Sequence, residues 1–130
     1  MSVTVGLKGR AEELVTQERT AAAACSGALP VYGTPFMTAL MEKAAWTSIA
    51  PCLEAGESTV GTKLDIAHLS ATPVGMKVWA ESEVTEVDGR RIVLTVTAYD
   101  EKGKIGEGSH ERFVVVDDRF LAKTAKKLEG

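Results

Sequence analysis

One long stretch of the chain, from Gly33 to Leu53, has the hydrophobic spacing of an α-helix. Apolar side chains recur in it at steps of three and four residues, which is one stripe of a helix. Thr34 followed by Pro35 is a helix start signal, because proline at the first helical position costs no hydrogen-bond donor that the helix needs. The opposite side is also largely apolar, so the pattern predicts a helix that is buried on most of its surface.

One carboxylate interrupts this apolar helix. Glu42 lies about one turn after Thr38 and about one turn before Trp46, on the second apolar side. Charged side chains are seldom buried without a partner. Glu42 is therefore a candidate for chemistry, although the pattern leaves open an ordinary solvated carboxylate.

From Ser58 onward the hydrophobic period changes from that of a helix to that of a strand. Four strands are predicted, over 58–69, 76–87, 90–100 and 105–117, and the Asp88-Gly89 pair is a strong hairpin signal between the second and third. Gly106 and Gly108 indicate a bulge or a close backbone approach. In the first strand, strict alternation places Val60, Thr62, Leu64 and Ile66 on one face and Gly61, Lys63, Asp65 and Ala67 on the other.

The remaining segments are shorter. Residues 10–20 fit an edge strand, and residues 20–26, with four consecutive alanines, fit a single helical turn capped by Thr20 and stopped by Gly27. Residues 119–130 are basic and are predicted to form a short helix or a tail. The order is then strand, long helix and four strands in an antiparallel meander, an α+β arrangement within a single domain over 1–130. One helix covers only one face of the sheet, so we expect a partner subunit, most simply in a homodimer.

Composition excludes several classes of function. The net charge is −3, without the basic patch typical of nucleic-acid binding. No apolar run approaches the roughly 18 residues of a membrane span, and no signal peptide is visible, so we expect no membrane association and a cytoplasmic location. Cys25 and Cys52 lack the spacing of metal ligands and are expected to be reduced thiols; no metal is expected.

Three polar side chains are candidates for one site: Thr34, Glu42 and His68. Thr34 and Glu42 lie eight residues apart on one helix, about 12 Å at 1.5 Å per residue, so they cannot touch directly. Simpler roles stay open, a helix cap for Thr34 and a local hydrogen bond for His68. His110, in Gly-Ser-His-Glu-Arg, competes with His68, and a surface ion pair explains Arg112 equally well.

Three motifs carry a resemblance to a known family. They are Gly-Thr-Pro-Phe-Met-x-x-Leu-Met-Glu at 33–42, Gly-Thr-Lys-Leu-Asp-Ile-x-His-Leu-Ser-Ala-Thr-Pro-x-Gly at 61–75 and Gly-Ser-His-Glu-Arg at 108–112. In this order, over about residues 10–120, the chain resembles the hotdog-fold thioesterases, most closely the fluoroacetyl-CoA thioesterase branch. The resemblance implies a curved antiparallel sheet around one long central helix and a dimer with active sites near its interface. It also implies hydrolysis of a small acyl-CoA to the free acid and coenzyme A, without a further cofactor.

The resemblance also assigns residues by motif. Thr34, Glu42 and His68 match the family's catalytic threonine, glutamate and histidine. Gly61 matches a glycine on the strand that binds the thioester and CoA, and Arg112 matches an arginine that contacts ligand. Glu42 would act as general base on water, or would attack the carbonyl itself to give an anhydride.

The segment before Thr34 departs from the family. It is short and alanine-rich, where the fluoroacetyl enzyme has a longer, aromatic lid, so the resemblance predicts thioester hydrolysis without predicting selectivity for fluoroacetyl. Val31 and Tyr32 are the side chains available to cover the pocket, and Phe36 is expected to bind substrate in a small acyl pocket. Basic residues at the rim are candidates for the CoA phosphates: Arg90, Arg91 and Lys104.

Other readings remain open. The same fold can hold a non-catalytic module that binds acyl-CoA or another small ligand, a hydratase or dehydratase, or a scaffold dimer without a pocket. Hydratases of this fold use an Asp–His pair in a different motif, which is absent here. The sequence is also compatible with a tetramer as well as a dimer.

Overall fold

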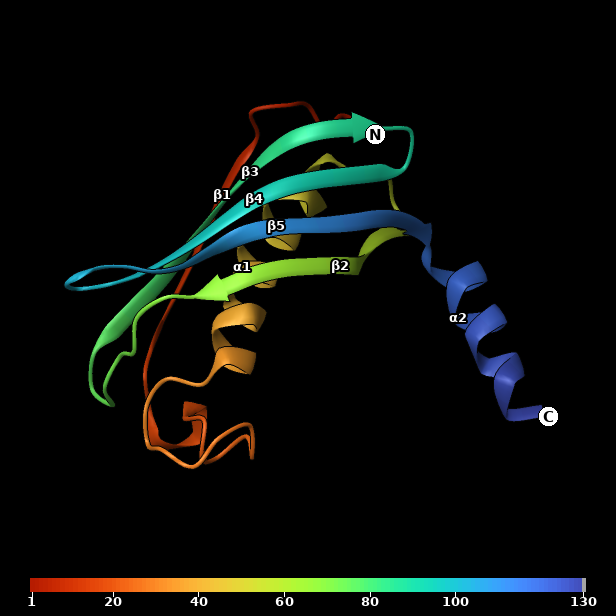
Figure 1. Ribbon diagram of the computed structural model, residues 1–130. Coiled ribbons are helices and arrows are strands. Elements are labelled where there is room, and N and C mark those ends of the chain that lie inside the picture. The colour runs from red at the N-terminus through yellow and green to blue at the C-terminus, as the bar shows by residue number, and fades with distance from the viewer. Residues whose placement is uncertain (130) are drawn as a thin grey trace.

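The computed structural model, which describes residues 1–129, is a curved antiparallel sheet with one long helix across its concave face (Figure 1). This is the predicted α+β architecture, a sheet of five strands wrapped around a central helix. Along the chain the elements are β1 (Lys8–Leu14), the 3₁₀ turn η1 (Gln17–Arg19), α1 (Thr34–Ile49), η2 (Ala50–Cys52), β2 (Glu57–His68), β3 (Lys77–Asp88), β4 (Arg91–Asp100), β5 (Gly103–Val116), α2 (Asp117–Ala125) and η3 (Lys126–Glu129).

The strand order in the sheet is β1-β3-β4-β5-β2. The predicted meander therefore holds for β3, β4 and β5, and is wrong for β2, which pairs with β5 instead of β3. The reason is that β1 already occupies the outer side of β3, so β5 offers the free edge to β2. β1 is an edge strand as predicted, but it spans Lys8–Leu14 instead of residues 10–20 and is followed by η1, and β2 forms the opposite edge.

The core lies between α1 and the inward side chains of the sheet. Every second residue is buried along β4 and, on β3, from Val78 to Val84, as the alternation predicts. The helix contributes Met37, Leu40, Met41, Ala44, Ala45 and Ile49. Gly106 on β5 lies directly under the helix, since a Cβ atom there would stand 2.6 Å from Met37 Sδ. The close approach expected for this glycine is therefore confirmed.

Three local details differ from the predicted ones. Gly33, not Thr34, is the N-cap of α1, and Thr34 is the first residue with helical geometry. The alanine segment forms a turn and not a helix, although the Ala23 N–H does donate to Thr20 Oγ1 at 3.0 Å. The β3–β4 hairpin turns at Gly89 and Arg90, one residue later than the Asp-Gly signal suggests, with Gly89 at a φ of 61°.

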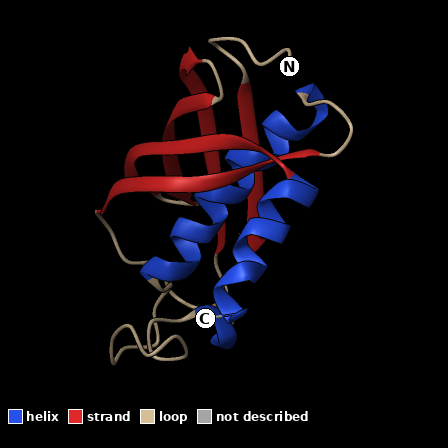
Figure 2. Ribbon diagram, turned by 90° about the vertical axis from the view of Figure 1, so that its right-hand side faces the viewer, coloured by secondary structure: helices blue, strands red, loops and turns tan. Residues whose placement is uncertain are grey.

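One flank of α1 is uncovered. Trp46 is 45% exposed, and Ala39 and Lys43 on the same flank are exposed as well. The expectation of burial on most of the helix surface is therefore wrong for this flank of the single chain. The C-terminal segment is a helix as predicted, and Figures 1 and 2 show α2 leaving the end of β5 and extending away from the sheet.

Candidate active site

Thr34 and His68 lie in direct contact. Thr34 opens α1 and His68 ends β2, and Thr34 Oγ1 stands 2.7 Å from His68 Nδ1. Because the N-cap position belongs to Gly33, the threonine hydroxyl is free of a capping role and can serve the imidazole. The start of the helix thus places a hydroxyl and a titratable ring side by side.

The other ring nitrogen of His68 is buried and has no hydrogen-bond partner among the described residues. Buried polar atoms in folded proteins are nearly always paired, so this nitrogen is available to a group that the single chain does not supply. Burial also lowers the pKa of His68 below its ordinary 6.5, so the neutral ring, which can accept a proton, predominates at neutral pH. A cleft of about 310 Å³ lies beside the pair, with Val31, Ser70 and Ala71 in its wall.

Glu42 forms a second cluster with residues of β2 and β5. Its side chain is 36% exposed, and Arg112 Nη1 donates to Glu42 Oε2 at 3.4 Å. Gly61 leaves the room for this carboxylate, because a Cβ atom at that position would stand 2.7 Å from Oε2. Replacing Gly61 by any other residue would therefore displace Glu42 or the strand.

Arg112 and His110 support the carboxylate from behind. Both are buried, at 6% and 1% exposure. Arg112 is fixed by hydrogen bonds from Nε to Thr59 Oγ1 at 2.8 Å and from Nη2 to the Thr59 carbonyl at 2.9 Å. The surface ion pair considered for Arg112 is therefore wrong.

The contacts of His110 determine its tautomer. Nδ1 lies 2.9 Å from the carbonyl of Lys63, which can only accept, so Nδ1 carries the proton. Nε2 then accepts from Arg112 Nη1 at 3.1 Å and lies 3.9 Å from Glu42 Oε2. Since both ring nitrogens are engaged, His110 holds Arg112 in place and is not free to act as a base.

A β-bulge at Thr62 decides which side chains of β2 face the helix. Gly61 pairs with Arg112 and Lys63 with Glu111, so Thr62 is an extra residue in the ladder. Strict alternation places Gly61 on the face opposite Leu64 and Ile66, and this expectation is wrong. The bulge shifts the alternation by one residue, so that Gly61 and His68 both face α1.

The structure thus brings Thr34 and His68 together but leaves Glu42 apart from them. The two groups are separated by about 12 Å along α1. The histidine next to Glu42 in the same chain is His110, which sequence reasoning treated only as a competitor of His68. His110 and Arg112 lie two residues apart on one strand, and this spacing is the sequence signal that places both side chains on the same face of the sheet.

Other expected site residues have different surroundings. Tyr32 is buried and donates to Glu13 Oε2 at 2.6 Å, and both Tyr32 and Val31 line the cleft. Phe36 is partly buried against the core and does not line this cleft. The basic residues proposed for CoA are paired with glutamates: Arg90 with Glu57, Arg91 with Glu86 and Glu111, and Lys104 with Glu107.

We expect the protein to lose thermal stability as the pH falls below about 6.5. Burial is the main cause that lowers the pKa of both His68 and His110 below 6.5. The unfolded chain therefore binds protons at these residues before the folded chain does. The free energy of unfolding is unaffected by them above the unfolded pKa and decreases as the pH falls toward the folded pKa values.

Melting temperatures measured between about pH 8 and about pH 5 would test this expectation. The variant His110→Gln, which keeps an acceptor for Arg112 but does not titrate, should show a shallower decline than the unsubstituted chain. A melting temperature that stays constant across this range in the unsubstituted chain would contradict the assignment.

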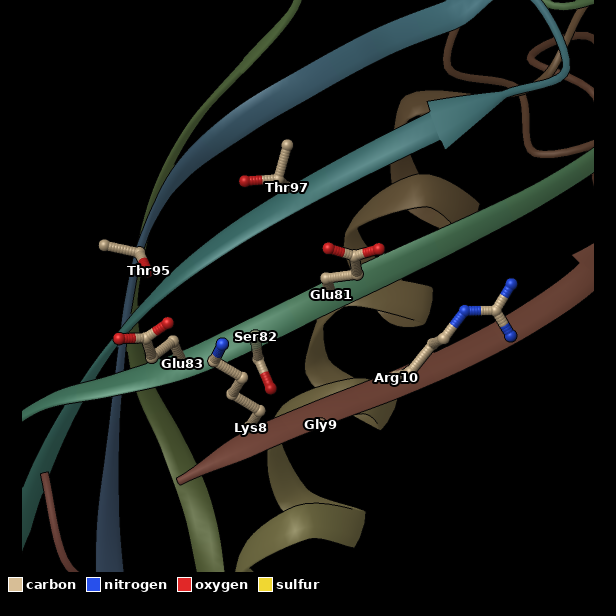
Figure 3. A pocket seen from close by; sticks show the side chains of 8 residues that line it. All are labelled: Lys8, Gly9, Arg10, Glu81, Ser82, Glu83, Thr95 and Thr97. Carbon is tan, nitrogen blue, oxygen red and sulfur yellow. The ribbon is translucent and has the colours of Figure 1, made fainter. Parts of the chain in front are cut away.

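A larger hollow lies on the outer face of the sheet, away from both clusters. It measures about 430 Å³, and Figure 3 shows the side chains that line it on β1, β3 and β4, with α1 behind the sheet. Its charged side chains are Lys8, Arg10, Glu81 and Glu83. No imidazole or thiol lines it, so it offers no group suited to proton transfer near neutral pH.

Three further features bear on the class of site. Within residues 1–129 no group of three or more His, Cys, Asp or Glu side chains is placed to hold a metal ion. Both cysteines carry free thiols. None of the helices described is long and apolar enough to cross a membrane.

Comparison with known proteins gives a consistent result. The family model for fluoroacetyl-CoA-specific thioesterase matches residues 15–118. A fluoroacetyl-CoA thioesterase from Streptantibioticus cattleyicolor is 42% identical over 97 residues, which cover 75% of this chain and 70% of that protein.

Solved structures show the same similarity in three dimensions. The fluoroacetyl-CoA thioesterase FlK superposes with a TM-score of 0.92 at 34% identity, covering 98% of each chain. A Thermus thermophilus protein of the thioesterase superfamily superposes with a TM-score of 0.91 at 31% identity, covering 99% of this chain and 96% of its own. The predicted hotdog architecture is therefore confirmed.

Proposed function

The chain belongs to the fluoroacetyl-CoA-specific thioesterase family, and we propose that Thr34, Glu42 and His68 carry out its reaction. As a member, it hydrolyses an acyl-CoA thioester to the free acid and coenzyme A. The observation that carries the residue assignment is the state of His68. Its ring is held by Thr34, and its second nitrogen is buried without a hydrogen-bond partner in residues 1–129.

Hydrolysis needs a nucleophile at the thioester carbonyl and stabilisation of the oxyanion that forms there. In one route Glu42 removes a proton from water while the water oxygen bonds to the carbonyl carbon. In the other route the Glu42 carboxylate attacks the carbonyl and gives an anhydride, which water then opens. In both, the carbon–sulfur bond breaks and the CoA sulfur receives a proton, for which His68 is the proposed carrier.

Thr34 and Arg112 have supporting roles in this proposal. The Thr34 hydroxyl donates to the substrate carbonyl or orients His68. Arg112, fixed by Thr59 and His110, donates a hydrogen bond to Glu42 and so positions the carboxylate for either route. Gly61 lets the substrate and the carboxylate approach the strand closely.

We further propose that the enzyme is a homodimer whose protomers meet at β2. This strand is a long edge with unpaired backbone groups, which natural proteins seldom leave open. The uncovered flank of α1 with Trp46 adjoins the same edge, since Trp46, Thr59 and Arg112 line one hollow of about 310 Å³. A second copy seated on β2 would cover both features; pairing of two such dimers would give a tetramer.

Such a dimer would also complete the site. If the two β2 strands pair in opposite directions about a two-fold axis, the His68 end of one strand approaches the Gly61 end of the other. His68 and Thr34 of one protomer would then face Glu42 of its partner. The separation of about 12 Å between Thr34 and Glu42 along α1 of one chain would then no longer keep the three groups apart.

The acyl group is proposed to be small. The cleft beside Thr34 and His68 measures about 310 Å³ and is walled in part by the Ala21–Tyr32 segment. Fluoroacetyl is the substrate named for the relatives, and Tyr32 is the one aromatic side chain that the Ala21–Tyr32 segment places at this cleft. We also propose a cytoplasmic location, where the free thiols of Cys25 and Cys52 would stay reduced.

Release of free thiol from a panel of acyl-CoA esters tests the function. We expect acetyl- and haloacetyl-CoA to be hydrolysed with a kcat/KM at least about tenfold above that for decanoyl- and benzoyl-CoA, because the small cleft does not accommodate longer or aromatic groups. Heat-treated protein is the control. Absence of thiol release from every ester, with binding retained, would favour the non-catalytic acyl-CoA-binding alternative.

A further inference from the structure

Another hollow, of about 300 Å³, lies between α2 and the end of β5. Its apolar lining consists of Val114, Val115, Val116 and Phe120. Phe120 is 39% exposed, so its ring is accessible to a ligand. Three cationic side chains complete the lining: Arg90, Arg119 and Lys123.

Two of these cations have no ion-pair partner. Within residues 1–129, Arg119 and Lys123 form no salt bridge, whereas Arg90 pairs with Glu57 at 3.4 Å. Lysine and arginine on adjacent turns of one helix thus present two uncompensated charges to the hollow. Asp117 and Asp118 precede them on α2 but do not line it. The hollow is positive in a chain whose net charge is −3.

The hollow adjoins the region around Glu42. Glu57 pairs with Arg90, which lines this hollow, and also lines the separate hollow that contains Arg112 and Trp46. From Arg112 to Val116 β5 advances four residues, about 13 Å. The pantetheine arm of CoA is about as long as four or five extended residues, so it spans this distance.

We infer that this hollow binds the nucleotide end of coenzyme A, with the phosphates on Arg119 and Lys123 and the adenine on Phe120. The inference rests on the proposed function, since it assigns a place to the part of the substrate remote from the thioester. Guanidinium and ammonium groups are the usual partners of phosphate, and aromatic rings stack on nucleobases. The other basic residues considered for this role, Arg91 and Lys104, are neutralised by glutamates.

Kinetics with whole and truncated substrates test the assignment. In the double variant Arg119→Ala/Lys123→Ala, KM for acetyl-CoA should rise by at least about tenfold, since each charged contact contributes about that factor. The value of kcat should stay within about twofold. KM for acetyl-pantetheine, which lacks the nucleotide, should be unchanged. A matched control is Lys8→Ala/Lys102→Ala, which removes two exposed charges elsewhere and should leave both KM values unchanged.

Inhibition by adenosine 3′,5′-bisphosphate gives a second measurement. It should compete with acetyl-CoA on the unsubstituted enzyme, with an inhibition constant at least about tenfold weaker on the Arg119→Ala/Lys123→Ala variant. Equal KM changes for acetyl-CoA and acetyl-pantetheine, or no change for either, would overturn the assignment while leaving the hydrolase intact. Absence of turnover in the unsubstituted chain would instead remove the proposed function.

Discussion

Replacing Glu42 by glutamine is expected to lower kcat by about 10³-fold, because glutamine can neither accept a proton nor attack a carbonyl. The substitution keeps the size of the side chain and one oxygen for Arg112 Nη1, so the packing around Gly61 should be retained. Thiol release from acetyl-CoA measures the effect, and a circular dichroism spectrum checks that the variant is folded.

Glu83→Gln is the matched control for this experiment. Glu83 is exposed on the outer face of β3, where the same loss of charge touches none of the proposed site residues. Its kcat should equal that of the unsubstituted enzyme. If Glu42→Gln turned over acetyl-CoA at an undiminished rate, Glu42 would have no part in the chemistry.

A mixture of two inactive variants, Glu42→Gln and His68→Ala, is expected to regain activity. In a dimer with composite sites, each heterodimer has one site with both groups intact and one site with neither. Random mixing in equal amounts makes about half of the dimers heterodimers, so activity should reach about a quarter of that of the unsubstituted enzyme. Each variant alone should remain about 10²- to 10³-fold below it.

The mixture must be prepared so that protomers exchange, by denaturing both variants together and refolding them. Two tags on the variants allow the heterodimer to be isolated and assayed by itself, and it should retain about half of the activity per dimer. Mixed protein that stays as inactive as its components would show that Glu42 and His68 do not act across an interface. The control is Glu42→Gln refolded with Glu42→Gln/His68→Ala, which has no route to an intact site.

Helices and strands whose positions depend on hydrophobic periodicity and on turn-forming residues are predicted well from the sequence. The helix that begins at Thr34–Pro35 and the alternation of β3 and β4 are local patterns, and each is confirmed within a few residues. The three motifs at 33–42, 61–75 and 108–112, taken together, identified the family correctly. Close packing at Gly106 was predictable because glycine within a strand indicates a neighbour that leaves no room for a side chain.

Features that depend on distant contacts could not be derived in the same way. The pairing of β2 with β5 follows from β1 having taken the edge of β3, which no local pattern records. The burial of His110 depends on the Lys63 carbonyl and on Arg112 together. The separation of Glu42 from His68 within one chain likewise depends on where β2 crosses α1, which no local pattern predicts.

The extra residue at Thr62 divides β2 into two halves that run out of phase with each other. The half that ends at Gly61 shapes the surroundings of the carboxylate, and the half that ends at His68 supplies the imidazole. If the same residues paired without this bulge, Gly61 and His68 would lie an odd number of positions apart in a regular strand and would face opposite sides of the sheet. The strand could then present either Gly61, beside Glu42, or His68 to α1, but not both.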